Sequence, residues 1–114
     1  MAKKTATALQ VKEPALILHC EPAPGIEAAA ASLIGPDDVV LNLASGVYGT
    51  GFGYWSQRYN KELVEIEVPY NEAIDPAAVA EAFRKRPDIK IVSLVHHDTP
   101  SGTINPAREI GKIV

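Results

Sequence analysis

The chain has 114 residues, of which 46% are hydrophobic and 22% charged, so it can form one domain with a modest hydrophobic core. Its formal net charge is -3 and its basic residues are scattered, which argues against nucleic acid as a partner. Cys20 is the single cysteine, so an internal disulfide and a thiolate cage for a metal ion are excluded. No apolar run reaches the roughly 18 residues of a membrane span, and residues 1–8 lack the apolar core of a signal peptide. We therefore expect a cytoplasmic protein.

Apolar runs and helical patterns alternate along the chain. Residues 1–12 resemble the remainder of a helix, and four apolar runs then predict strands over Ala15–Cys20, Val39–Ala44, Leu63–Val68 and Ile89–Val95. Helices are predicted between and after them, over Gly25–Ile34, Gly51–Asn60, Pro76–Arg86 and from Pro106 onward. The third of these has the strongest start signal, because Asp75 is a favourable N-cap and Pro76 suits the first helical position.

This alternation predicts an α/β fold with three layers, α/β/α, around a mostly parallel sheet. The second and fourth runs carry little polar interruption, which is typical of strands covered on both faces. In the third run Glu65 and Glu67 alternate with apolar residues, and we expect it nearer a sheet edge. A small complete domain of flavodoxin-like type remains the alternative to a piece of a larger sheet.

The most informative segment is His96–Pro106, where a buried-looking strand ends in polar, turn-forming residues. In open α/β sheets ligands bind at the carboxyl ends of strands. Thr99 offers a hydroxyl there, and Asp98 can accept hydrogen bonds from backbone N–H groups of the turn. His96 and His97 are adjacent and point to opposite faces of a strand, which disfavours a shared metal ion. A Ser-His-Asp triad is disfavoured as well, since no G-x-S-x-G turn is present.

Two other strand-to-helix turns are candidates. The turn at Glu21 precedes a helix, whose N-terminus favours anions, yet Pro22 and Pro24 remove two N–H donors and Glu21 is itself negative. The alternative interpretation is that Glu21 and Glu27 are solvated acidic residues near the start of a helix. The Ser45–Gly53 turn lacks G-x-G-x-x-G spacing, so a dinucleotide is not indicated, and Tyr48 can either lie on a planar ligand or pack in the core.

The runs Ile17–Pro22, Leu41–Gly49 and His96–Pro106 together resemble the large domain of class V, fold-type I aminotransferases. The segment from His96 to Gly102 is similar to their strand-end His-x-Glu-Ser/Thr-x-Thr-Gly signature. The resemblance implies that residues 1–114 form a single unit, a partial large domain that is truncated at both ends. It also implies that Tyr48 stacks on a pyridine ring and that Thr99 hydrogen-bonds near the phenolic oxygen of that ring.

The residues Glu21, Pro22 and Ala23 fall where most members of this family hold the 5′-phosphate of their cofactor. A phosphate carries about -1.5 to -2 charges at neutral pH, and Glu21 would repel it, whereas a free 5′-hydroxyl could donate to the carboxylate. The resemblance therefore implies a branch of the family that transfers the amino group of pyridoxamine to pyruvate, in vitamin B6 metabolism. Pyridoxamine and pyridoxal would be substrates, with no tightly bound cofactor.

Catalytic residues of the family, above all its Schiff-base lysine, would lie downstream of Val114, so we expect these 114 residues to be inactive alone. The family resemblance implies a homo-oligomer for the full-length protein. Two alternatives stay open. One is a class V aminotransferase of the alanine/serine–glyoxylate type that depends on pyridoxal 5′-phosphate, and the other is a small non-catalytic α/β binding module.

Overall fold

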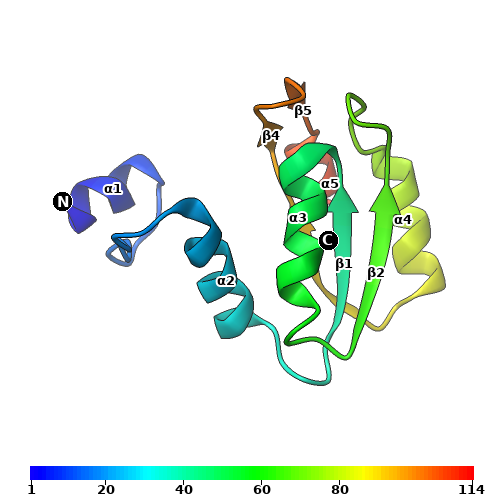
Figure 1. Ribbon diagram of the computed structural model, residues 1–114, viewed down its shortest axis with the longest axis horizontal. Coiled ribbons are helices and arrows are strands. Elements are labelled where there is room, and N and C mark those ends of the chain that lie inside the picture. Colours follow the sequence, from blue (N-terminus) through cyan, green and yellow to red (C-terminus); the bar gives the residue numbers. More distant parts are fainter.

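A parallel three-stranded sheet forms the centre of the fold in the computed structural model, which describes residues 1–114 (Figure 1). The strands are β1 (Val39–Ala44), β2 (Glu62–Glu67) and β3 (Ile89–Leu94), in the spatial order β2-β1-β3. Because β1 is central and pairs in parallel with both neighbours, all three carboxyl ends lie at one edge of the sheet. The expectation that the third apolar run lies at an edge is confirmed for β2.

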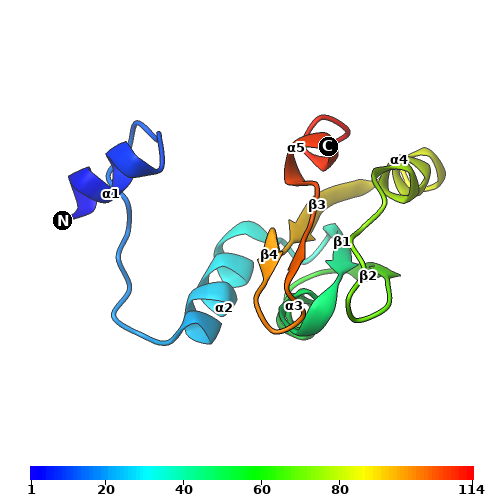
Figure 2. The same cartoon turned by 90° about the horizontal axis from the view of Figure 1, so that it is seen from above.

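Helices cover both faces of the sheet, which confirms the three-layer α/β/α prediction (Figure 2). The two helices on one face are α2 (Pro22–Leu33) and α3 (Gly46–Ser56). Those on the other are α4 (Pro76–Lys85) and α5 (Ala107–Ile110). Alternate residues of β1 therefore pack in two different apolar clusters, one on each face of the sheet.

The cluster on the α4 side is the larger of the two. It contains Leu41 and Leu43 of β1 with Ile74 and Val79, each at most 1% exposed. On the other face, Val40 packs with Ala30 and Ile34 of the α2 region. Burying apolar side chains in this way is the main favourable term in folding, and it fixes the register of β1 between the helices.

The helix α3 begins five residues earlier than the sequence pattern predicted, at Gly46 instead of Gly51. Gly46 has a φ of 69°, a left-handed conformation that lets the chain turn directly from β1 into the helix. The helix α2 also begins earlier, at Pro22 instead of Gly25, because proline suits the first helical position. By contrast, α4 begins at Pro76 as predicted, with the Asp75 side chain accepting a hydrogen bond of 2.8 Å from the Ala77 N–H.

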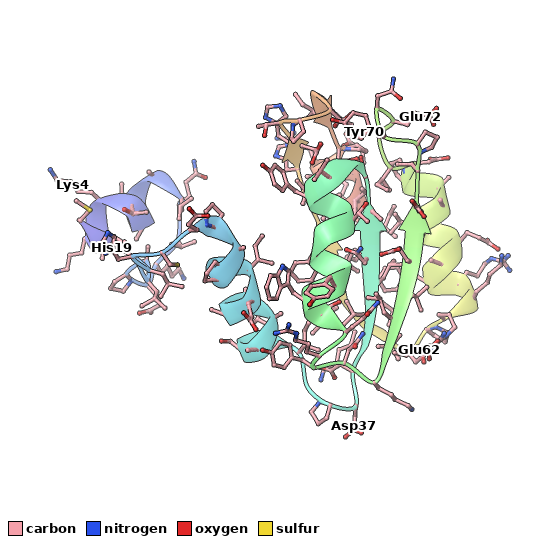
Figure 3. All side chains as sticks on the ribbon, viewed as in Figure 1. Lys4, His19, Asp37, Glu62, Tyr70 and Glu72 are labelled. Carbon is pink, nitrogen blue, oxygen red and sulfur yellow. The ribbon has the colours of Figure 1, made fainter.

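The prediction of a strand over Ala15–Cys20 is wrong, because this run pairs with no other strand. With α1 (Ala2–Ala8) it forms the N-terminal arm, defined here as residues 1–21, which extends away from the sheet (Figure 3 labels Lys4 and His19 in it). Leu16 is 86% exposed in this arm. A strand needs a neighbouring strand for its backbone groups, and no strand of the sheet pairs with this run.

A short hairpin replaces the simple turn predicted after β3. It consists of β4 (His97–Asp98) and β5 (Thr103–Ile104), which pair in antiparallel orientation, and α5 follows it. None of the helices combines the length and the apolar composition that crossing a membrane would require.

Candidate functional site

The start of α3 and the β4–β5 turn meet at the carboxyl end of the sheet (Figure 1). Tyr48 lies in the first turn of α3, and its side chain is half exposed rather than packed in the core. Thr99 is exposed in the turn between β4 and β5. The structure thus brings two of the predicted site residues to one corner, where a hydroxyl and an aromatic ring are both open to a ligand.

The carboxylate of Asp98 joins these two elements, although Asp98 itself is fully buried at 0% exposure. Its Oδ1 accepts a hydrogen bond of 2.9 Å from the N–H of Tyr48. Its Oδ2 accepts from the hydroxyl of Ser101 at 2.7 Å and from the Ser101 N–H at 3.1 Å. One side chain therefore fixes the first turn of α3 to the hairpin that carries Thr99.

Asp98 is held in its ionised form. Burial by itself would raise the pKa of this carboxyl group. The hydrogen bonds from the Tyr48 N–H, the Ser101 hydroxyl and N–H, and the Val47 N–H outweigh burial and lower its pKa below the usual range. A buried carboxylate that receives several N–H and O–H donors near a helix N-terminus is stable without a cationic partner.

Gly46 makes room for this arrangement. A Cβ atom at Gly46 would overlap the carboxyl group of Asp98, and the φ of 69° disfavours any side chain. Ser45, the N-cap of α3, does not cap the helix with its side chain, because its hydroxyl donates instead to the Glu72 carbonyl at 2.8 Å. Asp98, and not the N-cap residue Ser45, therefore accepts the hydrogen bond from the first turn of α3.

Asn105 holds the hairpin on the sheet. Its side-chain amide donates to the carbonyl of Val95 at 2.8 Å, and its Oδ1 accepts from the Ile74 N–H at 2.9 Å. Its own backbone N–H donates to the carbonyl of His96 at 2.8 Å. Asn105 is buried, and it ties the end of β3 and the segment before α4 to the β4–β5 hairpin. Sequence reasoning missed this role, for which the Asn-Pro pair after the hairpin is the only local signal.

The third predicted position, at Glu21, Pro22 and Ala23, lies at the start of α2 and is exposed. Glu21 is the N-cap of α2 by backbone conformation, but its side chain makes no capping hydrogen bond. Figure 1 shows the start of α2 next to the N-terminal arm and toward the same end of the molecule as the start of α3. No hydrogen bond links Glu21 to Tyr48 or to Thr99. The structure therefore leaves the Glu21 carboxylate free without bringing it into contact with the other two residues.

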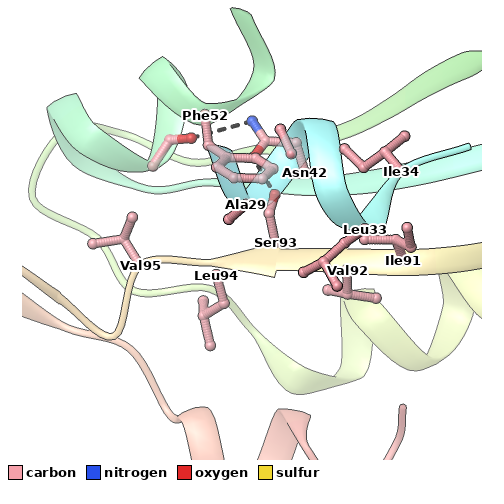
Figure 4. A pocket seen from close by; sticks show the side chains of 12 residues that line it. Ala29, Leu33, Ile34, Asn42, Phe52, Ile91, Val92, Ser93, Leu94 and Val95 are labelled. Atoms are coloured by element: carbon pink, nitrogen blue, oxygen red, sulfur yellow. Dashed lines mark hydrogen bonds between the residues drawn. The ribbon is translucent and has the colours of Figure 1, made fainter. Parts of the chain in front are cut away.

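A cavity of about 260 Å³ lies elsewhere, between α2, α3 and β3 (Figure 4). It is mainly apolar, and its polar side chains are already engaged. Asn42 donates to the Gly49 carbonyl at 3.2 Å and to Glu65 Oε2 at 2.6 Å, and it accepts from the Ser93 hydroxyl at 2.6 Å. Because these polar side chains are bonded to other residues of the chain, none is free to orient a ligand, and the cavity is separate from the site at the hairpin. No cluster of three or more His, Cys, Asp or Glu side chains could hold a metal ion.

The parallel sheet with its strand-end hairpin defines an α/β unit of the kind that binds a ligand at the carboxyl edge of the sheet. No protein-family model matches the chain. It is 64% identical over 111 residues to the pyridoxamine–pyruvate transaminase of Mesorhizobium japonicum, covering 97% of this chain and 28% of that protein. The chain belongs to the class V, fold-type I aminotransferase family.

Solved structures agree with this assignment. The chain superposes on the pyridoxamine–pyruvate aminotransferase of Mesorhizobium loti with a TM-score of 0.94 at 63% identity, over 99% of this chain and 29% of that one. An alanine–glyoxylate aminotransferase from Nostoc shares the fold, with a TM-score of 0.88 at 23% identity. The chain thus corresponds to part of the large domain and spans under a third of the length of these proteins.

Proposed function

We propose that the chain supplies the ring-binding part of a transaminase that moves the amino group of pyridoxamine to pyruvate, giving pyridoxal and alanine. The observation that carries this proposal is Glu21, a free carboxylate at the open N-terminus of a helix. The names of the Mesorhizobium relatives support the same pair of substrates.

Tyr48 and Thr99 would bind the ring of pyridoxamine. The half-exposed Tyr48 ring can stack on the pyridine face, since offset stacking of aromatic rings is favourable. The exposed Thr99 hydroxyl can donate to, or accept from, the phenolic oxygen at the ring edge. Neither contact carries out the reaction, so both residues act by binding and orienting the substrate.

The start of α2 does not fit a 5′-phosphate. Glu21 would repel the dianion, and Pro22 lacks the N–H that would otherwise bind it. A 5′-hydroxyl fits, because it can donate a charge-assisted hydrogen bond to the carboxylate. The ring of a B6 vitamer is therefore compatible with this chain, whereas its phosphate ester is not, and the proposal assigns pyridoxamine and pyridoxal as substrates rather than pyridoxal 5′-phosphate as a cofactor.

Neither Lys90 nor Lys112 supplies the amine that the family uses in catalysis, because neither lies at the hairpin corner. The Lys90 ammonium group pairs with Asp38 at 2.7 Å, and Lys112 follows α5. We therefore expect that the 114-residue chain alone does not transaminate. The test of function needs the remaining parts of the enzyme.

A chimera provides this test. The matched segment of the Mesorhizobium japonicum transaminase is replaced by this chain, and turnover of pyridoxamine and pyridoxamine 5′-phosphate is measured with pyruvate and with glyoxylate. We expect preference for pyridoxamine and pyruvate. Glu21→Gly and Glu21→Ser should shift the ratio of kcat/KM toward the phosphate form by about tenfold or more. Glu13→Ser, in the exposed arm, is the matched control and should leave the ratio unchanged.

Preference of the unmodified chimera for the phosphate form with glyoxylate would contradict the proposal and favour the alanine/serine–glyoxylate type. A folded chimera that turns over neither vitamer would favour a non-catalytic binding module.

A further inference from the structure

We infer that Asp98 is a positioning residue, which sets Tyr48 and Thr99 at a fixed separation by binding one element with each of its two carboxylate oxygens. The inference rests on the proposed function only for the identity of the ligand, the ring of pyridoxamine, that binds between those two residues. The bridging geometry itself comes from the hydrogen bonds of Asp98.

The first half of the bridge runs to α3. Amide groups in the first turn of a helix have no partner within the helix, and Ser45 does not supply one. The N–H of Tyr48 donates to Asp98 Oδ1 at 2.9 Å instead. Because Tyr48 is the third residue of α3, the position of its backbone, and hence of its ring, depends on a side chain from another element.

The second half runs to the turn between β4 and β5. The Ser101 hydroxyl and N–H both donate to Asp98 Oδ2, and the Gly102 N–H donates to the Asp98 carbonyl at 2.9 Å. These bonds close a loop around Thr99, which lies between the residues that they connect. Thr99 itself is exposed, so its position is set through Asp98 and Ser101 and not by packing of its own side chain.

A carboxylate is the group that this position requires. Every group that reaches the carboxylate is a donor, and none is an acceptor. An asparagine of the same size would turn its NH₂ group toward one set of donors and lose that half of the bridge.

The experiment compares Asp98→Asn with Asp75→Asn, a matched control at the N-cap of α4. Hydrogen exchange of the Tyr48 and Ser101 amides is measured in the 114-residue chain, and KM for each substrate is measured in the chimera described above. For Asp98→Asn we expect at least about tenfold faster exchange at Tyr48 or Ser101, and at least about tenfold higher KM for pyridoxamine. KM for pyruvate should stay within about twofold of its value in the unmodified chimera. A merely structural defect would instead raise KM for both substrates.

Ser101→Ala is the second variant, in case Asp98→Asn does not fold. It removes only a hydroxyl on the Thr99 side, so KM for pyridoxamine should rise while the Tyr48 amide stays protected. The inference is overturned if exchange at Tyr48 and Ser101 is unchanged in folded Asp98→Asn, or if both KM values rise equally. Should the unmodified chimera fail to use pyridoxamine, the proposed function fails, while the exchange data still decide whether Asp98 holds the two elements together.

Discussion

Of two apolar runs of six residues in this molecule, one is a buried strand and the other is unpaired and exposed. Val39–Ala44 becomes β1, in which every residue is buried between two strands and two layers of helices. Ala15–Cys20 lies in the N-terminal arm, unpaired and largely exposed. The two runs differ little in apolar content, so the difference comes from the neighbours that each finds along the described chain. An apolar pattern indicates a segment that can be buried, but burial requires a partner surface.

The arm and the sheet also differ in how they are connected. The hydrogen bonds of α1 and of the turn after it all stay within residues 1–11. The sheet, in contrast, is linked across long sequence separations, as in the contact of Asn42 with Ser93. We therefore expect the free energy of unfolding of the 114-residue chain to respond strongly to changes in the sheet and weakly to changes in the arm.

The largest effect is expected for Leu41→Ala. Leu41 is fully buried in the larger core cluster, so its truncation should destabilise the chain by about 2–5 kcal/mol. Leu16→Ala in the arm is the matched control and should change stability by less than about 0.5 kcal/mol. Urea titration followed by circular dichroism measures both. Equal destabilisation by the two substitutions would mean that the arm is packed in solution, and the contrast between the regions would fail.

A smaller effect is expected for Gly53→Ala in α3. A Cβ atom there would lie 2.9 Å from the side-chain amide nitrogen of Asn42 and 2.9 Å from Glu65 Oε2, so either the helix would have to shift or the hydrogen bond between these two side chains would be disturbed. The expected loss is about 1–3 kcal/mol, measured by the same titration. Gly25→Ala in α2 has open space around the new methyl group and should stabilise by up to about 1 kcal/mol. A neutral Gly53→Ala would show that α3 is not closely packed on the sheet.

A still smaller effect is expected for Lys90→Met at the start of the sheet. The hydrogen bond from Lys90, at 2.7 Å, is the main cause of the lowered pKa of Asp38, and the Gly35 N–H adds to it. A carboxyl group whose pKa is lowered on folding stabilises the fold above its unfolded pKa of about 3.9, and this stabilisation disappears as the pH falls through the lower folded value. Lys90→Met should therefore lower Tm at pH 7 and have little effect near pH 2.

Thermal unfolding at a series of pH values measures this difference. Lys85→Met, which removes an exposed partner of Glu81, is the control and should give a smaller change at every pH. A loss of stability with Lys90→Met that does not depend on pH would contradict the assignment to Asp38.

The smallest effect is expected when residues 1–12 are deleted. A helix of seven residues, such as α1, has little stability of its own, and its hydrogen bonds do not reach the sheet. The deletion should change the free energy of unfolding, measured by urea titration, by less than about 0.5 kcal/mol. A large loss would show that α1 packs on the rest of the chain in solution.

The sequence predicted those parts of the fold whose signals are local. The run that forms β1 has a single polar residue, Asn42, among five apolar ones, and the Asp-Pro pair before α4 is a strong helix-start signal, so both elements were predicted correctly. The start of α3 was not, because glycines usually end helices and here Gly46 opens one with help from Asp98. The strand assigned to Ala15–Cys20 was wrong because no sequence pattern tells whether a neighbouring strand is present.

For the site, the sequence indicated the carboxyl edge of the sheet, and the structure places Tyr48 and Thr99 there with both side chains exposed. It also predicted that Asp98 accepts backbone hydrogen bonds within its own turn, which the Ser101 contact confirms. The contact of Asp98 with Tyr48 could not be predicted from the sequence, since it joins segments that only the folded sheet brings together. The assignment of ring contacts to Tyr48, Thr99 and Glu21 stays a prediction.

The bond between Tyr48 and Asp98 also has a consequence for the order of events during protein synthesis. The two residues are separated by 50 positions, so α3 leaves the ribosome well before the carboxylate that caps it. At 5–20 residues per second, the delay is roughly 3 to 10 seconds, far longer than the microseconds that a helix needs to form or melt. The first turn of α3 therefore frays and re-forms many times in the nascent chain, and the corner that holds Tyr48 acquires its final shape only after the hairpin has emerged.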